Sequence, residues 1–331
     1  MWIFLLLVAS VSANPQWNIP GIPGHPGKPH IPGVPEFPKV PQIPGVPEFP
    51  KVPQIPGVPG LPQIPGFPGF NFHQPAFPED VRRSSSSSRI VNGWPAKLGQ
   101  FPYQARSRAK KGAHSYSICG GSILSETVVL TACHCTVGHD SFDMGFGSID
   151  MKDPAIEMTV TKTIQHEDFN PKTLNNDIAL FILPEKLTYT ENIKPIQLPS
   201  YSQKDKSFVG EKATVSGHGK TGDHESVSTK LMYVYTKVIE NEECRKHFGR
   251  RLIKPFTLCV VGWDSANQST CQGDSGGPLV VDDDNLGEVI QIGVVSFVAK
   301  KGCEAQIPTG FVRVSHYLDW INKNGDISIR E

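Results

Sequence analysis

The chain has 331 residues, with 32 basic residues balanced against 32 acidic ones. This balance excludes any global charge that would indicate a nucleic acid or an anionic membrane as a partner. Most of the 30 prolines lie before residue 80, so composition divides the chain into a Pro-rich front and an ordinary globular rear.

The first 13 residues, MWIFLLLVASVSA, form a short apolar run that ends in small residues. This pattern is typical of a secretory signal peptide, although no Lys or Arg precedes the apolar part. The run is too short for the alternative, a membrane anchor, which needs about 20 apolar residues. We therefore expect residues 1–13 to be a signal peptide and the protein to be secreted, in a compartment where disulfides form.

A proline repeat dominates the segment that follows. Proline occupies every third position from Pro20 to Pro68, and the unit IPGVPEFPKVPQ occurs at 31–42 and again at 43–54. Polyproline II has three residues per turn, which places these prolines on one edge, and collagen is excluded because glycine does not fill every triplet. We expect an extended, PPII-rich or disordered spacer, with a ligand for an aromatic groove as the alternative.

Two arginines and five serines then lead into the sequence RIVNG at residues 89–93. Arginines among small polar residues make an exposed stretch that proteases can reach. This stretch separates the Pro-rich front from the globular rear.

After residue 93, short apolar and β-branched runs alternate with Gly, Pro and Asn turns. The runs are SILSETVVLTA at 122–132, TVTKTI at 159–164, IALFIL at 178–183, ATVSG at 213–217 and VIQIGVVSFV at 289–298. This spacing predicts an all-β sandwich or barrel. Near the C-terminus, VSHYLDWINK at 314–323 has apolar residues at helical spacing, which predicts one final helix.

Three short strings carry the candidate chemistry. They are LTACHC, which contains His134, NDIAL, which contains Asp177, and CQGDSGGP, which contains Ser275. A serine hydroxyl is a weak nucleophile at neutral pH and needs an adjacent base, which a histidine can supply. One such string alone could be accidental, but the three together, with flanking cysteines, indicate nucleophilic catalysis.

On these strings, the rear of the chain resembles the chymotrypsin family of serine proteases, from Ile90 to the final helix. The order His, Asp, Ser differs from the orders in subtilisins and α/β-hydrolases. The resemblance implies an all-β fold of two six-stranded antiparallel β-barrels with a C-terminal helix. We accordingly expect a signal peptide at 1–13, a pro-segment at 14–89 and a protease domain at 90–331.

The resemblance implies a secreted serine endopeptidase that works through an acyl-enzyme. His134 would take the proton of Ser275 and later give it to the leaving amine, while Asp177 would orient the imidazole. The N–H groups of Gly273 and Ser275 would form the oxyanion hole. Ser296 resembles the serine that supports the buried aspartate, and we also count it among the residues of the substrate site.

The same resemblance implies a zymogen. Cleavage after Arg89 would create a new amino terminus at Ile90, whose ammonium group would pair with Asp274. Because no cysteine precedes Cys119, the pro-segment has no disulfide tether and should separate on activation unless it binds noncovalently.

The primary pocket is expected to lack a fixed charge. Ser269 resembles the residue at the pocket floor, and Val298 and Thr309 align with its walls, so we expect an elastase-like preference for small aliphatic P1 residues. A chymotrypsin-like pocket for Leu, Phe or Tyr is the alternative. Neither pocket would favour cleavage after Arg89, so activation should need a separate trypsin-like protease.

Seven cysteines leave one thiol over. Family spacing implies the pairs Cys119–Cys135, Cys244–Cys259 and Cys271–Cys303. Cys133 is then unpaired, and we expect it to be a small buried thiol. The alternatives are an exposed reactive thiol, or a different pairing in which Cys133 replaces Cys135 as the partner of Cys119.

Two further positions depart from or complicate the family pattern. His218 stands where the family usually has tryptophan, and we assign it no catalytic role. The sequon at Asn267 lies on the expected pocket wall, which argues against glycosylation there.

Two other classes of function compete with the protease. One is a non-catalytic homologue that acts as a binding module, although all three catalytic residue types are present. The other is a structural protein built around the Pro-rich rod. For the protease we expect protein or peptide substrates, no metal or cofactor, no nucleic-acid or membrane partner, and a monomer.

Overall fold

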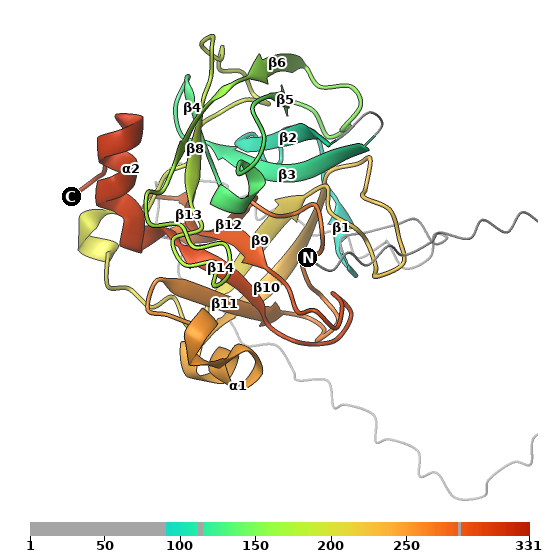
Figure 1. Ribbon diagram of the computed structural model, residues 1–331, viewed down its shortest axis with the longest axis vertical. Coiled ribbons are helices and arrows are strands. Elements are labelled where there is room, and N and C mark those ends of the chain that lie inside the picture. Colours follow the sequence, from blue (N-terminus) through green and yellow to red (C-terminus); the bar gives the residue numbers. More distant parts are fainter. Residues whose placement is uncertain (1–90, 112–114, 284–285) are drawn as a thin grey trace, which may run out of the picture. The chain divides into compact units, whose positions relative to one another are not determined.

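The computed structural model describes residues 91–111, 115–283 and 286–331. The expected signal peptide at 1–13, the pro-segment at 14–89 and the residue Ile90 lie outside the described residues. Figure 1 colours the described part of the rear block along the chain.

The first half of this block forms a curled antiparallel sheet with the order β6-β5-β2-β3-β4-β8-β7. Its strands are β2 (Gln104–Lys111), β3 (Ser115–Ile123), β4 (Val128–Thr131), β5 (Phe142–Phe146), β6 (Ile156–Val160), β7 (Lys162–Gln165) and β8 (Ala179–Ile182). Only Thr161 separates β6 from β7, so one bent strand joins the two edges of the sheet into a barrel-like curl. Alternate residues point inward and fill it with apolar side chains such as Phe142, Phe146 and Phe181.

The second half forms a closed antiparallel barrel. Its strands are β9 (Lys212–Gly217), β10 (Met232–Ile239), β11 (Thr257–Gly262), β12 (Pro278–Asp283), β13 (Glu288–Phe297) and β14 (Thr309–Arg313). The hydrogen-bonded ring runs β9-β10-β11-β14-β13-β12 and back to β9, while the short β1 (Trp94–Pro95) adds to β10. Closure leaves few unpaired edges, and the interior packs around Val215, Leu258 and Phe311.

The predicted C-terminal helix is present. A 3-10 turn, η3 (Val314–Tyr317), runs directly into α2 (Leu318–Gly325). Leu318 and Ile321 are fully buried in a core cluster that also contains side chains of β4, β8 and β13. The helix therefore packs where the two sheets meet, and the expected fold of two β-barrels with a final helix is confirmed.

One helix was not expected from the sequence, α1 (Asn241–Leu252). Cys244, Phe248 and Leu252 recur every fourth residue and pack into one cluster, but only Cys244 is fully buried and the rest of the helix is mostly polar or charged, so its apolar stripe is narrow. Two 3-10 turns complete the inventory, η1 (Cys133–Cys135) and η2 (Tyr201–Gln203).

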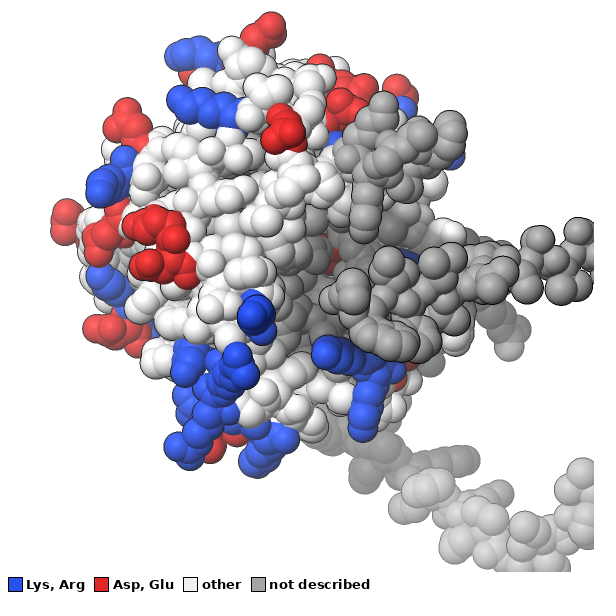
Figure 2. Space-filling model, in the orientation of Figure 1, with Lys and Arg blue, Asp and Glu red and all other residues white. Residues whose placement is uncertain are grey.

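Acidic and basic side chains are interspersed on the face shown in Figure 2, with lysines and arginines gathered over α1. Arg250 and Arg251 lie in the last turn of that helix, where a positive charge offsets the negative end of the helix dipole. None of the helices among the described residues is long and apolar enough to cross a membrane.

Candidate active site

His134 lies in η1, directly after strand β4. The Cys119–Cys135 disulfide ties the residue after His134 to β3, while β4 ends three residues before His134. The His134 side chain remains 28% exposed, so one edge of the ring can be reached from solvent.

Asp177 is fully buried and stands two residues before β8. Its Oδ1 accepts the backbone N–H of His134 at 2.8 Å, and its Oδ2 lies 2.7 Å from His134 Nδ1. The Ser296 hydroxyl, from β13 of the other barrel, donates to the same Oδ2 at 2.6 Å. These three contacts offset the cost of burying a carboxylate, and they join the two barrels.

The electrostatics of this pair set the state of the imidazole. Burial by itself lowers the pKa of His134, but the charge of Asp177 and its hydrogen bond outweigh burial, and the pKa of His134 is raised. The neutral ring that donates from Nδ1 keeps Nε2 as an acceptor. His134 can therefore take a proton at Nε2 and remain paired with Asp177 when it is charged.

Ser275 lies in the turn before β12 and is half-buried. Its carbonyl accepts the N–H of Gly120 at 2.7 Å. The Ser275 hydroxyl has no hydrogen-bond partner among the described residues, so no hydrogen bond joins it to His134. In unliganded enzymes such a bond is often long.

Gly276 shows how closely this turn approaches the segment before His134. Its φ of +78° lies in the left-handed region. A Cβ there would collide with Thr131 Oγ1 and lie 3.2 Å from the Ala132 nitrogen. Only glycine lets the Ser275 turn sit against this strand end, and this contact brings Ser275 beside the His134 turn.

Position 273 also requires glycine, because its φ is +103° and a Cβ there would lie 3.0 Å from the Gly219 Cα. Among the residues with a described placement, neither the Gly273 N–H nor the Ser275 N–H has a hydrogen-bond acceptor. Two unsatisfied backbone donors next to one hydroxyl can stabilise an oxyanion.

Asp274 is fully buried, and its carboxylate accepts the N–H groups of Gly219 at 2.7 Å and Cys271 at 2.9 Å. Burial raises the pKa of Asp274 to about 7, against the opposing effect of these hydrogen bonds. No cation among the described residues pairs with it. Its expected partner, Ile90, lies outside the described residues, but the next residue, Val91, is buried against the Cys271–Cys303 disulfide.

Two of the expected pocket residues meet. The hydroxyl oxygens of Ser269 and Thr309 lie 3.1 Å apart, and both side chains are buried. Val298 is half-buried and packs against the cluster formed by Val91, Cys271 and Cys303. The structure thus pairs the expected floor with one expected wall, while Val298 contacts the neighbouring disulfide.

The three expected disulfides are present, Cys119–Cys135, Cys244–Cys259 and Cys271–Cys303. Cys133 carries a free thiol and is fully buried, as the first of its three interpretations requires. Burial, and then the charge of Asp177, raises the pKa of Cys133 to about 12.

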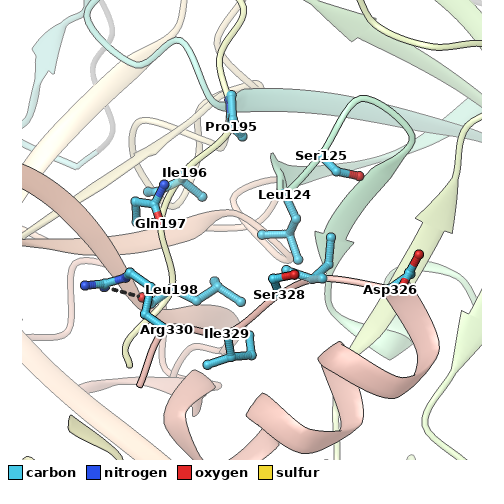
Figure 3. A pocket seen from close by; sticks show the side chains of 11 residues that line it. Leu124, Ser125, Pro195, Ile196, Gln197, Leu198, Asp326, Ser328, Ile329 and Arg330 are labelled. Atoms are coloured by element: carbon cyan, nitrogen blue, oxygen red, sulfur yellow. Dashed lines mark hydrogen bonds between the residues drawn. The ribbon is translucent and has the colours of Figure 1, made fainter. Parts of the chain in front are cut away.

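A separate cavity of about 200 Å³ lies along the C-terminal tail (Figure 3). Leu124, Ile196 and Ile329 contribute apolar side chains, and Arg330 donates to the Leu198 carbonyl at 2.7 Å. None of the candidate residues lines it, so it is distinct from the site described here.

The sequence assigned no role to Asn176 or Tyr317, although both lie next to the site. The Tyr317 hydroxyl donates to Asn176 Oδ1 at 2.9 Å, and Asn176 has a positive φ of +56°. An asparagine directly before the candidate aspartate was the available signal, because Asn adopts this conformation more readily than most residues. Its tyrosine partner lies 141 residues away in the sequence.

Comparisons with known proteins identify the family of the chain. The family model described as Trypsin matches residues 90–321. A collagenase of Hypoderma lineatum is 38% identical over 256 residues, which covers 77% of this chain and 93% of that protein. A chymotrypsin of Phaedon cochleariae is 33% identical over 243 residues, covering 72% of this chain and 83% of that protein.

A solved structure titled HL collagenase superposes with a TM-score of 0.66 at 38% identity, covering 72% of this chain and all of that one. The family match spans both barrels and all three strings that carry the candidate residues. The chain therefore belongs to the trypsin family of serine proteases, which are related to chymotrypsin, and it is a serine endopeptidase that acts on proteins.

Proposed function

We propose that the protein hydrolyses peptide bonds through an acyl-enzyme, with Ser275 as nucleophile, His134 as general base and acid, and Asp177 as the residue that orients His134. The observation that carries this proposal is the buried Asp177 carboxylate, which binds both the backbone and the ring of His134. A carboxylate held in this way favours the Nδ1-protonated ring and stabilises the imidazolium that forms during the reaction.

The steps follow from these groups. Ser275 Oγ bonds to the substrate carbonyl carbon while its proton moves to His134 Nε2. The resulting oxyanion would accept the unsatisfied N–H groups of Gly273 and Ser275. His134 then gives the proton to the leaving amine as the C–N bond breaks. A water repeats the sequence on the ester, with His134 as base, and releases the acid and the free serine.

Activation by cleavage after Arg89 is the second part of the proposal. The new ammonium group at Ile90 would pair with Asp274, and two observations support this: Asp274 is buried without a cationic partner among the described residues, and Val91 is already buried nearby. A buried carboxylate without a counter-charge is costly, so the pairing would stabilise the turn that holds Gly273. The enzyme would be secreted through its signal peptide and activated by a separate trypsin-like protease, and it would act as a monomer.

The proposed specificity is for an uncharged P1 residue. It rests on the Ser269–Thr309 hydroxyl pair, which offers no negative charge to a lysine or an arginine. A small aliphatic P1 residue is the first expectation, and Leu, Phe or Tyr is the alternative. The name of one relative, collagenase, adds collagen to the substrates worth testing.

The test uses the full chain, treated with immobilised trypsin that is then removed, and a peptide library that varies P1. The proposal expects cleavage after uncharged residues and a loss of at least about a thousandfold in kcat for Ser275→Ala treated in the same way. Equal activity of the two proteins would overturn it. No activity in either, with binding of a peptide retained, would instead favour the non-catalytic homologue.

A further inference from the structure

Asp177 occupies the centre of a tight backbone turn. The N–H of Ile178 donates to the carbonyl of Asn176 at 2.9 Å, which closes a three-residue γ-turn around the aspartate. The direction in which the buried carboxylate leaves the backbone therefore depends on the conformation of Asn176. A non-glycine residue at φ +56° is sparsely populated and persists when its surroundings hold it there.

Both ends of the Asn176 amide are held. Its Nδ2 donates to the carbonyl of Asp168 at 3.0 Å, and its Oδ1 accepts the Tyr317 hydroxyl at 2.9 Å. The first bond is local, within the same loop. The second comes from η3, immediately before the C-terminal helix.

Tyr317 is itself rigidly placed. It is 3% exposed, and its ring makes an edge-to-face contact with His166, with centroids 5.5 Å apart. The backbone N–H of His166 donates to the carbonyl of Ile178 at 3.1 Å, on the other side of Asp177. Burial, and then the nearby charge of Asp177, raises the pKa of Tyr317, so its hydroxyl remains protonated and available as a donor.

We infer that Tyr317 and Asn176 are positioning residues for Asp177: the tyrosine hydroxyl holds Asn176 in its left-handed conformation and thereby aims the carboxylate at His134. This inference rests on the proposed role of Asp177 as the group that orients the base. It also gives the C-terminal segment a part in the chemistry, because its tyrosine acts on the aspartate across the interface between the two barrels.

A purely structural role makes a different prediction. In that case the bond from Tyr317 to Asn176 would only anchor the C-terminal helix, as the contact between Tyr201 and Asp319 at the start of α2 does. Tyr201→Phe is therefore the matched control, since it removes one tyrosine hydroxyl that contacts the same helix but leaves Asn176 untouched. Both variants should lower the melting temperature slightly, because each loses one hydrogen bond.

The kinetic test compares activated wild type, Tyr317→Phe and Tyr201→Phe across pH. For Tyr317→Phe we expect kcat to fall about three- to tenfold with KM unchanged, the range that the loss of one hydrogen bond allows. The acid limb of kcat/KM should move to lower pH, because a misaimed Asp177 stabilises the His134 imidazolium less. Tyr201→Phe should change neither. A Tyr317→Phe enzyme with wild-type kcat and acid limb, whatever its melting temperature, would overturn the inference.

Asn176 provides an internal check. Asn176→Gly keeps access to a positive φ but loses both amide bonds, whereas Asn176→Ala also strains the backbone. We expect kcat to fall in the order wild type, Gly, Ala. Adding Tyr317→Phe to Asn176→Gly should cause no further loss, because the hydroxyl acts through the amide. Additive losses in the double variant would show that Tyr317 acts by another route and would contradict the inference.

A readout without turnover separates this inference from the proposed function. In the Ser275→Ala background, the proton on His134 Nδ1 reports the bond to Asp177 through its low-field NMR resonance, which His134→Gln assigns by removing it. Tyr317→Phe should move this resonance upfield, and Tyr201→Phe should leave it in place. An unmoved resonance would reject the positioning role, even if Ser275→Ala had confirmed the mechanism. A resonance that moves in Tyr317→Phe would support the positioning role of Tyr317 even if the proposed acyl-enzyme mechanism proved wrong.

Discussion

Ser296 and Asp177 lie in different barrels, 119 residues apart in the sequence, and are joined by a hydrogen bond of 2.6 Å from the serine hydroxyl to Oδ2. The same oxygen lies 2.7 Å from His134 Nδ1. The buried carboxylate therefore depends on both barrels for its orientation and for the hydrogen bonds that replace water.

This relationship predicts the effect of Ser296→Ala. The variant leaves one lone pair of a buried carboxylate unsatisfied, which costs about 1.5–3 kcal/mol. We expect kcat/KM to fall about ten- to a hundredfold, as measured on a peptide with a favoured P1 residue. Ser122→Ala is the control, because Ser122 is also buried but its hydroxyl has no hydrogen-bond partner among the described residues. Similar losses in both variants would argue against a specific role for the Ser296 bond.

If the Ser269–Thr309 pair lies in the primary pocket, as proposed, it predicts how that pocket can be widened. Thr309→Gly removes both the methyl and the hydroxyl, whereas Thr309→Ser removes only the methyl and keeps the bond to Ser269. Pocket groups of this size discriminate by about 1–3 kcal/mol. We therefore expect Thr309→Gly to raise the ratio of kcat/KM for Phe over Ala at P1 by about tenfold or more, with Thr309→Ser intermediate. An unchanged ratio would place Thr309 outside the primary pocket.

The raised pKa of Asp274 predicts that the stability of the uncleaved chain depends on pH. Its pKa is raised from 3.8 to about 7 by burial, so the folded state binds a proton that the unfolded state has already lost. Stability contributed by this group is present at pH 4 and declines as the pH rises toward 7. In urea unfolding, wild type should lose stability relative to Asp274→Asn over this range.

Cleavage after Arg89 should change that dependence. An ammonium group beside Asp274 would hold the carboxylate charged, so the decline between pH 4 and 7 should disappear in the activated enzyme. Arg89→Gln, treated with the same protease, is the control that keeps the uncleaved behaviour. If activated and uncleaved proteins follow the same pH curve, the proposed partner of Asp274 is wrong.

Local patterns were sufficient to predict much of this molecule. The strand runs, the final helix and the strings around His134, Asp177 and Ser275 are contiguous in sequence, and each element forms as its pattern indicates. Helix α1 was not predicted because its apolar face is a narrow row of three residues, Cys244, Phe248 and Leu252, in an otherwise mostly polar and charged segment.

Contacts between residues that lie far apart in the sequence could not be predicted from local patterns. The bond from Tyr317 to Asn176 joins polar groups that only the packing of the C-terminal segment brings together. A tyrosine at helical spacing is also what an ordinary core residue looks like in sequence. Val298 shows the same limit, since its placement against the Cys271–Cys303 disulfide depends on how the loop after β13 folds back.

The free thiol of Cys133 gives the last prediction, because it lies next to His134 and yet is fully buried. Burial and the charge of Asp177 raise its pKa to about 12, so almost no thiolate exists at neutral pH. We expect iodoacetamide to leave Cys133 unmodified in the folded enzyme and to label it after unfolding without reductant, as read by peptide mass spectrometry. Cys133→Ala should keep kcat within about twofold, since the thiol acts as a small apolar group. Rapid labelling of the folded protein, with loss of activity that Cys133→Ala prevents, would instead show that the thiol opens to solvent beside His134.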